Sequence, residues 1–512
     1  MCKYPARQVA KRWFTPVVLL LWACFTAWCV CGFPPPVDLP ADGAQIETLK
    51  NLIRGDPEVQ KYYRIQIVIG YGLPFWVFLP VAFIWNGAVA ARLALWVCLQ
   101  LFPLSHLALL RAFRRADWAV LLGLPLAFNF SYWYGLMPGL FAQPLALFSV
   151  AAFVRTLERP NWKRIAVFNL LAAATLLCHL VAFVVLAVLI GALALATAPR
   201  WRSFKLAVQG LVLPAALSVL KILPMAHRAV MPGPWPATEF AGRSHLTWFF
   251  ETYRPEGKLA VLGPLLVSTL FVLAYLKRRK IEPVGPAAMF AAALGLYLIT
   301  PKTLSGIFLI SVRLPVFAGM LSLLLVSADV LPIPRYLRGA LAAVCLLSLV
   351  ETGLFHWRFA RAVDGLDQMI AGPVRSPHGY WSLAGSQLLG SKHIYAEHLG
   401  QWLTATRGGV GHNFFADAEH HPVHFKPGID IPAQLNRASP EQLAWFEEIL
   451  IYGEGPLPAW LNGWREESRA GRWRKLIPSR VSAQPQIHTQ PCGVPTLVPL
   501  KTLPSPYSGI AT

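Results

Sequence analysis

The sequence has few charged residues, and acidic residues are especially scarce. Only 14% of its 512 residues are charged, and 46 basic residues stand against 25 acidic ones. A composition that is 55% hydrophobic is typical of a membrane protein rather than a soluble globular domain. The basic residues do not gather on one domain, so the net charge of +21 does not indicate a nucleic-acid partner.

Several signatures of soluble enzymes and of metal sites are also missing. The chain contains no P-loop, no dinucleotide-binding fingerprint and no internal repeat. Only Cys492 of the eight cysteines lies in the C-terminal region, so that region has no disulfide framework. No Cys or carboxylate stands at ligand spacing from the histidines there, so we expect no zinc site at His412, His420, His421 and His424.

What the sequence does have is a series of apolar runs separated by short basic clusters. Runs of about 18 or more apolar residues predict membrane-spanning helices. Cytoplasmic loops are enriched in Lys and Arg, so successive clusters must be separated by an even number of crossings if all of them are cytoplasmic. Six clusters hold 20 of the basic residues: the N-terminal stretch and residues 111–115, 155–164, 200–205, 277–280 and 335–338.

This requirement predicts a topology. A cleaved signal peptide is the alternative for the first run, but its apolar stretch is usually only 7–15 residues long, so we expect an uncleaved first membrane helix. Residues 65–85 contain Gly70, Gly72, Pro74 and Pro80, so we expect a re-entrant or surface-lying element there rather than a crossing. The N-terminus is then cytoplasmic and the C-terminus extracytoplasmic, in a plasma membrane (the inner membrane of a bacterium). About eleven crossings are expected, at residues 13–32, 88–110, 118–134, 138–154, 165–178, 180–197, 206–224, 258–276, 284–300, 314–328 and 339–356.

Two carboxylates, Asp38 and Asp42, follow the first run directly, on a proline-rich outer loop. Such a carboxylate at the mouth of a helix bundle is well placed for general-base catalysis. The alternative is that Asp42 only caps the next helix and that Asp38 is a solvated loop residue. We expect that helix to be amphipathic and to lie on the bilayer surface, because apolar residues recur at helical spacing, at Ile46, Leu49, Leu52 and Ile53.

These features resemble the GT-C class of integral-membrane glycosyltransferases. The shared order is a first helix, an acidic outer loop, a membrane-hugging element and a helix that opens with AARLAL (90–95). Other stretches are similar to segments of poorly characterised multi-pass bacterial proteins, and the likeness extends from about residue 10 to residue 470. These stretches are VDLPADGAQIETLKNLIRGDP (37–57), PLAFNFSYWYGLMPGLFAQPLAL (125–147), CHLVAF (178–183) and GGVGHNFFADAEHHPVHFKP (408–427).

The resemblance implies a sugar donor carried on polyprenyl phosphate and an acceptor that is a glycan, a lipid or a protein. It implies Asp38 as the base of an inverting transfer, with Asp42 as the second candidate or as a ligand of a divalent cation such as Mg²⁺ or Mn²⁺. Basic residues near outer helix ends are candidates for binding the donor phosphate, namely Arg313, Lys221 and Arg92. Each of the three could instead only extend to the lipid headgroups.

Three further candidates have a competing structural explanation. His179 lies at the tip of a tight helical hairpin, where it could face a cavity or simply hydrogen-bond within the turn. Glu239 and His245 lie in an aromatic-rich outer loop, residues 225–257, which could bind a sugar or form an interfacial aromatic belt.

Together these patterns predict an all-α polytopic membrane protein with about 11 transmembrane helices and a small extracytoplasmic C-terminal α/β domain. We expect a transmembrane domain over residues 1–356, with the acidic loop at 33–64, then the α/β domain over 357–480 and a disordered tail over 481–512. Within the α/β domain, 385–406 should be helical and 441–453 should run from helix to strand. The alternative function is a non-enzymatic lipid or glycan transporter or an envelope-polysaccharide assembly protein.

Overall fold

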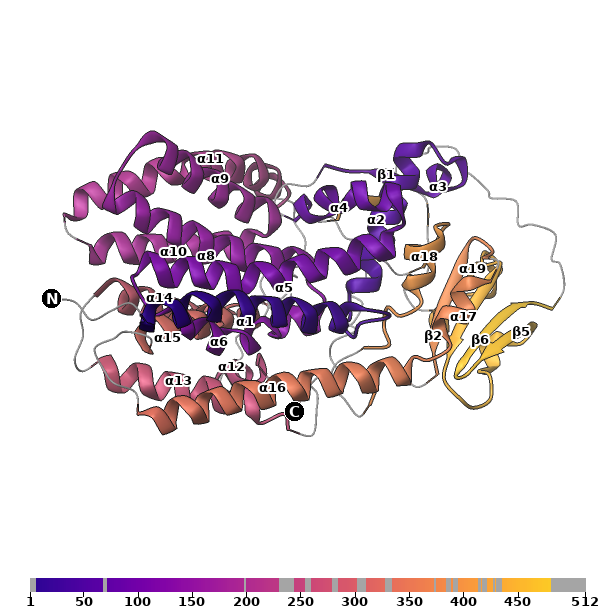
Figure 1. The fold of residues 1–512 in the computed structure, drawn as a ribbon. Coiled ribbons are helices and arrows are strands. Elements are labelled where there is room, and N and C mark those ends of the chain that lie inside the picture. Colours follow the sequence, from indigo (N-terminus) through magenta and orange to yellow (C-terminus); the bar gives the residue numbers. More distant parts are fainter. Residues whose placement is uncertain are drawn as a thin grey trace.

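The protein is a bundle of long helices with a small sheet near one end (Figure 1). The structure is a computed structural model, and it describes residues 6–67, 71–197, 199–229, 244–253, 259–278, 284–301, 310–326, 334–372, 374–383, 388–389, 395–412, 416, 421–426, 429 and 435–479. Within these residues, three helices are long and apolar enough to cross a membrane: α5 (Gly87–Ala112), α8 (Met137–Glu158) and α16 (Arg335–Ala362). In α16, the candidate span begins at Tyr336.

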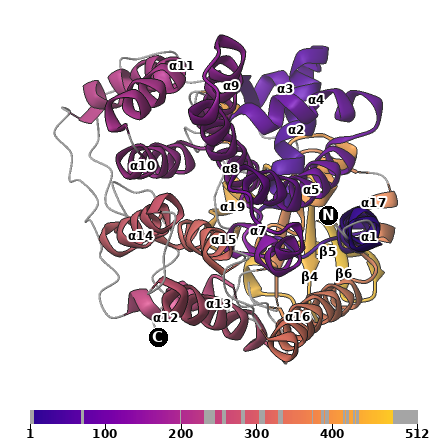
Figure 2. The same cartoon turned by 60° about the vertical axis from the view of Figure 1, so that its left-hand side comes forward.

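Shorter apolar helices pack beside these three, as the end-on view in Figure 2 shows. The expected mostly helical architecture is therefore confirmed, while the number of crossings stays a prediction. The remaining helices of the bundle are α1 (Ala6–Val30), α9 (Trp162–Cys178), α10 (Leu180–Ala196), α11 (Arg200–Ala229), α13 (Leu262–Arg278), α14 (Val284–Ile299) and α15 (Pro315–Val326). The short helix α12 (Ser244–Glu251) precedes α13.

The single helix expected over residues 118–134 is wrong. Gly123 and Pro125 interrupt the segment, and the Asn129 side chain accepts a hydrogen bond from the Ser131 N–H at 2.9 Å, which starts a new helical turn. The segment is buried despite this irregular path, and its last residues approach the acidic loop. It consists of η1 (Asp117–Ala119), α6 (Val120–Gly123), η2 (Pro125–Ala127) and α7 (Phe130–Trp133).

The acidic loop leads into α2 (Leu39–Arg54), which does not have the exposed face that we expected to lie on the bilayer. Its side chains Ile46 and Leu49 are fully buried and Leu52 nearly so, as are most of its polar side chains, whereas Ile53 is 46% exposed. The helix is enclosed because α4 (Leu73–Ile84), α5 and α18 (Gln401–Arg407) all pack around it. The C-terminal region therefore covers the surface that sequence periodicity assigned to lipid.

The element α4 has 12 residues, which rise about 18 Å along the helix axis. This length is little more than half of a hydrocarbon core of about 30 Å, so we keep the interpretation of a re-entrant or surface-lying element. Before it, α3 (Pro57–Tyr62) leads into β1 (Tyr63–Ile65), which pairs antiparallel with β3 (Val423–Phe425).

The C-terminal sheet has the strand order β2-β4-β6-β5, with β2 parallel to β4 and the other pairs antiparallel. It is tied to the end of α16, because Tyr452 Oη donates to the Ala362 carbonyl at 2.7 Å and Trp473 Nε1 to the Val363 carbonyl at 3.1 Å. The elements are α17 (Leu366–Ala371), β2 (His378–Ser382), α19 (Pro440–Leu443), β4 (Glu448–Tyr452), β5 (Trp464–Ala470) and β6 (Trp473–Pro478).

Two sequence expectations for this region have different outcomes. The expected helix-to-strand run over residues 441–453 is confirmed by α19 and β4. The expected helix over 385–406 is wrong for residues 395–400, which form turns and bends before α18 begins. At their end, Gly400 lies so close to the Tyr380 ring that a Cβ would not fit. Residues 384–387 and 390–394 and the tail at 481–512 lie outside the described residues.

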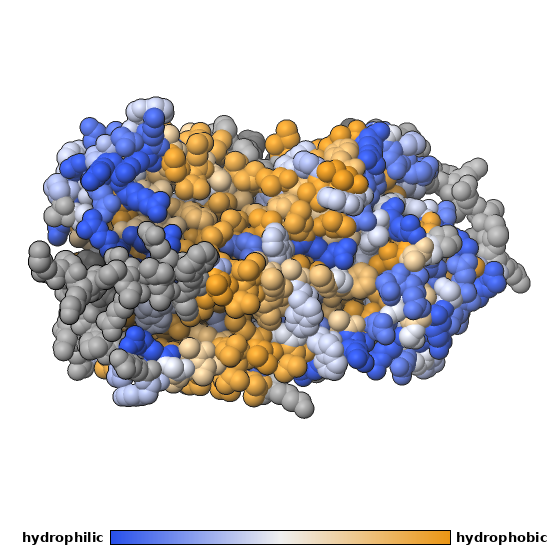
Figure 3. All heavy atoms as spheres, in the orientation of Figure 1, coloured by the Kyte–Doolittle hydropathy of each residue, from blue (hydrophilic) through white to orange (hydrophobic). Residues whose placement is uncertain are grey.

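The bundle has two different ends, separated by a broad hydrophobic band (Figure 3). At one end, the basic clusters 111–115 and 155–164 come together, because Arg114 of the first forms an ion pair at 2.9 Å with Glu158, which lies within the second. At the other end, α2, α4 and the C-terminal sheet gather (Figure 1). The candidate catalytic residues lie at this second end.

Candidate active site

Asp38 is held in place by its backbone rather than by its side chain. The Val37 N–H donates to the Trp133 carbonyl at 3.1 Å, and the Asp38 N–H donates to the Tyr134 carbonyl at 2.9 Å. Asp38 occupies the N-cap position of α2, yet its carboxylate makes no capping hydrogen bond there. The side chain is only 18% exposed, so the alternative of a solvated loop residue is wrong.

Asp42 does not cap α2, which corrects the second alternative. Its side chain is almost fully buried, and it accepts a hydrogen bond from the backbone N–H of Met137, the first residue of α8. A carboxyl at a helix N-terminus is favoured by the helix dipole. Burial, followed by the charge of Asp38, nevertheless raises the pKa of Asp42 well above its usual range, which favours its neutral form.

The electrostatic surroundings of Asp38 come from distant parts of the chain. Burial raises the pKa of Asp38 to about 8, the positive charge of Arg313 opposes this rise, and the charge of Glu397 adds to it. His398 Nε2 lies 3.6 Å from Asp38 Oδ1. A carboxylate that titrates near neutral pH is well suited to accept a proton during catalysis.

Arg313 ends a short turn, η3 (Ser311–Arg313), directly before α15. Its Nη1 lies 2.5 Å from Nε2 of His179, which occupies the break between α9 and α10. Because arginine only donates hydrogen bonds, this ring nitrogen of His179 must be the unprotonated acceptor. The Nε of Arg313 is buried and has no hydrogen-bond partner among the described residues, so its N–H is a donor that these residues leave unsatisfied.

Tyr71 connects the groups of this site. Its ring centre lies 5.7 Å from that of His179, and Arg313, Asp42 and Asp38 all act on it electrostatically. We define the site cluster as Asp38, Asp42, Tyr71, His179 and Arg313. The structure thus brings together four of the candidates that the sequence singled out and adds Tyr71.

The fold of this chain is similar to that of solved structures. No protein-family profile and no curated protein matches the sequence. Among solved structures, ArnT from Cupriavidus metallidurans in the apo state matches with a TM-score of 0.55 and 14% identity, over 91% of this chain and 98% of that one. ArnT from the same organism bound to undecaprenyl phosphate matches with a TM-score of 0.51 and 14% identity, over 90% of this chain and 97% of that one. ArnT is a GT-C glycosyltransferase.

The chain has the GT-C fold. Because the match covers nearly all of both chains, this fold includes the C-terminal region that supplies His398 as well as the helical bundle. The resemblance seen in the sequence motifs is therefore confirmed at the level of the fold.

The remaining candidates are not part of the site cluster. In Arg92, Nη1 donates to the Gly32 carbonyl at 3.0 Å and Nε to the Ala88 carbonyl at 3.2 Å, so the side chain ties α1 to α5. Its role as a phosphate ligand stays a prediction. Glu239 and the side chains of Lys221 and His245 lie outside the described residues.

A divalent cation would find few protein ligands here. Among the described residues, no group of three or more His, Cys, Asp or Glu side chains could hold a metal ion. Within the part of the chain that the structure describes, Asp42 Oδ2 is buried without a hydrogen-bond partner, and Asp38 is near enough to act on it electrostatically. These residues fit the way Mg²⁺ is commonly bound, by one or two carboxylates together with water and substrate phosphates.

Sequence reasoning missed Tyr71, Glu397 and His398. No linear signal could have placed His398 beside Asp38, because 360 residues separate them and only the docking of the C-terminal region brings them together. The sequence does contain one residue that indicates how Asp38 is supported, namely Gly135 in the turn after α7. Its φ of +71° lies in the left-handed region that favours glycine.

We expect Gly135→Ala to slow transfer by roughly 100-fold, since misplacing a catalytic group by about 1 Å can cost this much. A Cβ at Gly135 would lie 2.7 Å from the backbone nitrogens of Asp38 and Leu39 and would push the loop away. The matched control is Gly139→Ala, whose Cβ would meet its nearest neighbours at 3.8 Å. Transfer rates and melting temperatures of both variants should be measured together. Equal transfer rates would show that this turn does not position the base.

Proposed function

We propose that the protein is a membrane glycosyltransferase that moves a sugar from a polyprenyl-phosphate donor to an extracytoplasmic acceptor, with inversion. The observation that carries this proposal is the buried Asp38, whose pKa is raised to about 8, beside Arg313 at one end of a GT-C bundle. A polyprenyl phosphate donor is supported by the second matching structure, in which ArnT is bound to undecaprenyl phosphate.

In this mechanism, Asp38 accepts the proton of the acceptor hydroxyl while the hydroxyl oxygen attacks the anomeric carbon of the sugar. The bond between that carbon and the phosphate oxygen breaks, and its electron pair leaves with the phosphate. Arg313 donates hydrogen bonds to the departing phosphate, whose negative charge grows in the transition state. Attack opposite the leaving group inverts the configuration.

Asp42 has a supporting role in this proposal. Its raised pKa disfavours the ionised form that a base needs, and the hydrogen bond from the Met137 N–H links α2 to the start of α8 and so holds Asp38 in place against the bundle. It remains the second candidate for the base, and it would become a ligand if Mg²⁺ or Mn²⁺ binds with the donor phosphate.

The proposal requires that the site faces the extracytoplasmic side. Single cysteines in a cysteine-free background should therefore react with a membrane-impermeant maleimide at Ile67, which is 85% exposed at the site end. Cysteines at Trp162 and Trp201, which are 74% and 77% exposed beside the basic clusters, should react only after the membrane is opened. Labelling of intact cells at Trp162 or Trp201 would contradict this orientation.

The proposed activity can be tested on purified full-length protein. It should be incubated with envelope lipids that contain polyprenyl-phosphate sugars, and free polyprenyl phosphate should be quantified by mass spectrometry. A glycosyltransferase breaks the bond between sugar and phosphate and releases the free lipid phosphate, whereas a transporter or an assembly protein leaves the bond intact. No release with any acceptor fraction, from protein that remains folded, would favour that alternative.

A further inference from the structure

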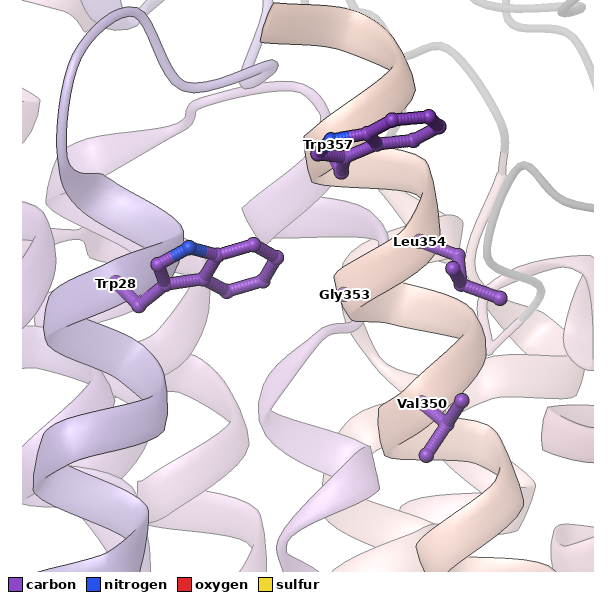
Figure 4. A pocket seen from close by; sticks show the side chains of 5 residues that line it. All are labelled: Trp28, Val350, Gly353, Leu354 and Trp357. Carbon is purple, nitrogen blue, oxygen red and sulfur yellow. The ribbon is translucent and has the colours of Figure 1, made fainter.

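The helices α1 and α16 lie on the flank of the bundle (Figure 2). An apolar groove lies between them (Figure 4). Its volume is about 420 Å³, and it is lined by Trp28, Val350, Gly353, Leu354 and Trp357. Trp28 and Trp357 are each 50% exposed and Leu354 is 51% exposed, so large apolar side chains line an open surface rather than a closed core. In a membrane protein, such a surface contacts lipid.

The groove exists because α16 carries a glycine where α1 comes closest. A Cβ at Gly353 would lie 3.2 Å from the Trp28 ring and 3.4 Å from the Phe25 ring. Figure 4 shows the Trp28 indole pointing toward Gly353, with Trp357 one turn further along α16. Any larger residue at this position would narrow the groove.

The groove has a positively charged end. Residues 350, 354, 357 and 361 share one face of α16, and the Arg361 guanidinium carbon lies 5.0 Å from the centre of the Trp357 ring. Arg358 lies beside it, and its Nε donates to the Leu354 carbonyl at 3.4 Å. Neither guanidinium forms an ion pair with a carboxylate in the part of the chain that the structure describes.

The position of the arginines along α16 matches the boundary of a bilayer. Residues 339–357 contain one charged side chain, Glu351, and rise about 28 Å, close to the thickness of the hydrocarbon core. Arg338 precedes this stretch and Arg358 follows it. Trp357 then lies at the interface, where tryptophan is enriched, and Arg358 and Arg361 lie at headgroup level at the end that carries Asp38.

We propose that this groove binds an anionic phospholipid of the outer leaflet. One acyl chain lies along Trp28, Gly353 and Val350, and the headgroup phosphate is bound by Arg358 and Arg361, because guanidinium groups bind phosphate through paired hydrogen bonds. The donor lipid is a less suitable occupant, because the phosphate candidate Arg313 contacts His179 and does not line the groove. This inference does not depend on the proposed enzymatic activity.

The test uses the full-length protein in detergent with phosphatidylglycerol that carries a photoreactive group on one acyl chain. Cross-links should form on peptides containing Trp28 or Leu354, and unlabelled phosphatidylglycerol should compete better than phosphatidylcholine. Each of Arg361→Gln and Arg358→Gln should raise the concentration for half-maximal cross-linking about 5-fold, the equivalent of about 1 kcal/mol per cation. Arg338→Gln, at the other end of the same helix, is the matched charge control and should change nothing.

Several results would overturn the proposal. They are cross-links that avoid the groove, equal competition by the two phospholipids, and an unchanged half-maximal concentration in the Arg358→Gln/Arg361→Gln double variant. Stronger competition by undecaprenyl phosphate than by phosphatidylglycerol would assign the groove to the donor lipid instead. A dimer by native mass spectrometry that blocks cross-linking would assign it to a second copy of the chain.

Discussion

Replacing Asp38 by Asn is expected to slow sugar transfer by about 10²–10⁴-fold, the usual contribution of general-base catalysis. Asparagine keeps the size of the side chain and some of its hydrogen bonding but cannot accept the acceptor's proton. The backbone bonds that hold the loop, from Val37 to Trp133 and from Asp38 to Tyr134, do not involve the side chain, so the fold should persist. Release of polyprenyl phosphate measures the rate, and the melting temperature verifies folding.

Asp42→Asn is the matched control for this experiment. Burial raises the pKa of Asp42 and so favours its neutral form, which asparagine resembles, and the amide oxygen can still accept from the Met137 N–H. We therefore expect a much smaller loss of activity than in Asp38→Asn. The reversed order would move the base to Asp42, and a loss restored by added Mg²⁺ or Mn²⁺ would make Asp42 a metal ligand. Full activity in both variants would remove this loop from the mechanism.

The pH dependence gives a second, independent readout of the base. Only the ionised carboxylate accepts a proton, and burial raises the pKa of Asp38 to about 8. Activity should therefore increase with pH through the neutral range and level off above about 8. Asp38→Asn should lose this dependence along with most of its activity, whereas a residual rate with the same profile would assign the titration to another group.

Much of the fold could be predicted because bilayer-spanning helices need long apolar runs, and these are visible one segment at a time. The hairpin at His179 is an example, since α9 ends at Cys178 and α10 begins at Leu180, as expected. The relation between two of the basic clusters could also be predicted, since the ion pair of Arg114 with Glu158 places residues 111–115 and 155–164 at one end.

The surroundings of α2 could not be predicted, because they depend on tertiary contacts. Its apolar spacing fits a bilayer surface and a protein core equally well, and only the docking of α18 decides for the core. Its polar residues also have partners remote in sequence: Glu47 accepts from the Gly87 N–H at the start of α5 at 2.7 Å, as Asp42 does at the start of α8. Two acidic side chains of one helix thus bind the N-termini of two long helices.

This arrangement explains why Asp38 can be a precise base on what looks like a loop. The helix that follows it is fixed at two points to the bundle, and residues 133–135 fix the loop before it. The C-terminal region adds His398 at 3.6 Å and encloses the carboxylate. Burial then raises the pKa of Asp38, because a carboxylate removed from water holds its proton more tightly than a solvated one.

Arg313→Gln is expected to lower kcat/KM for the lipid-linked donor by about 10- to 150-fold, since a hydrogen bond to a charged group typically contributes about 1.5–3 kcal/mol. The variant should also change the pH profile. The positive charge of Arg313 opposes the rise in the pKa of Asp38, so its removal should raise that pKa further and move the increase in activity to higher pH. Initial rates at several pH values and donor concentrations measure both effects.

Arg313→Lys separates the two roles of this side chain. Lysine keeps the positive charge and should hold the pH profile near that of the wild type, but it lacks the paired donors that bind phosphate and should lose part of the donor dependence. A side chain that only extends to the headgroups would give unchanged donor dependence and an unchanged pH profile in both variants. A shifted pH profile with unchanged kcat/KM for the donor would mean that Arg313 only lowers the pKa of Asp38. The donor phosphate would then be bound by other residues, with Arg92 and Lys221 as the next candidates.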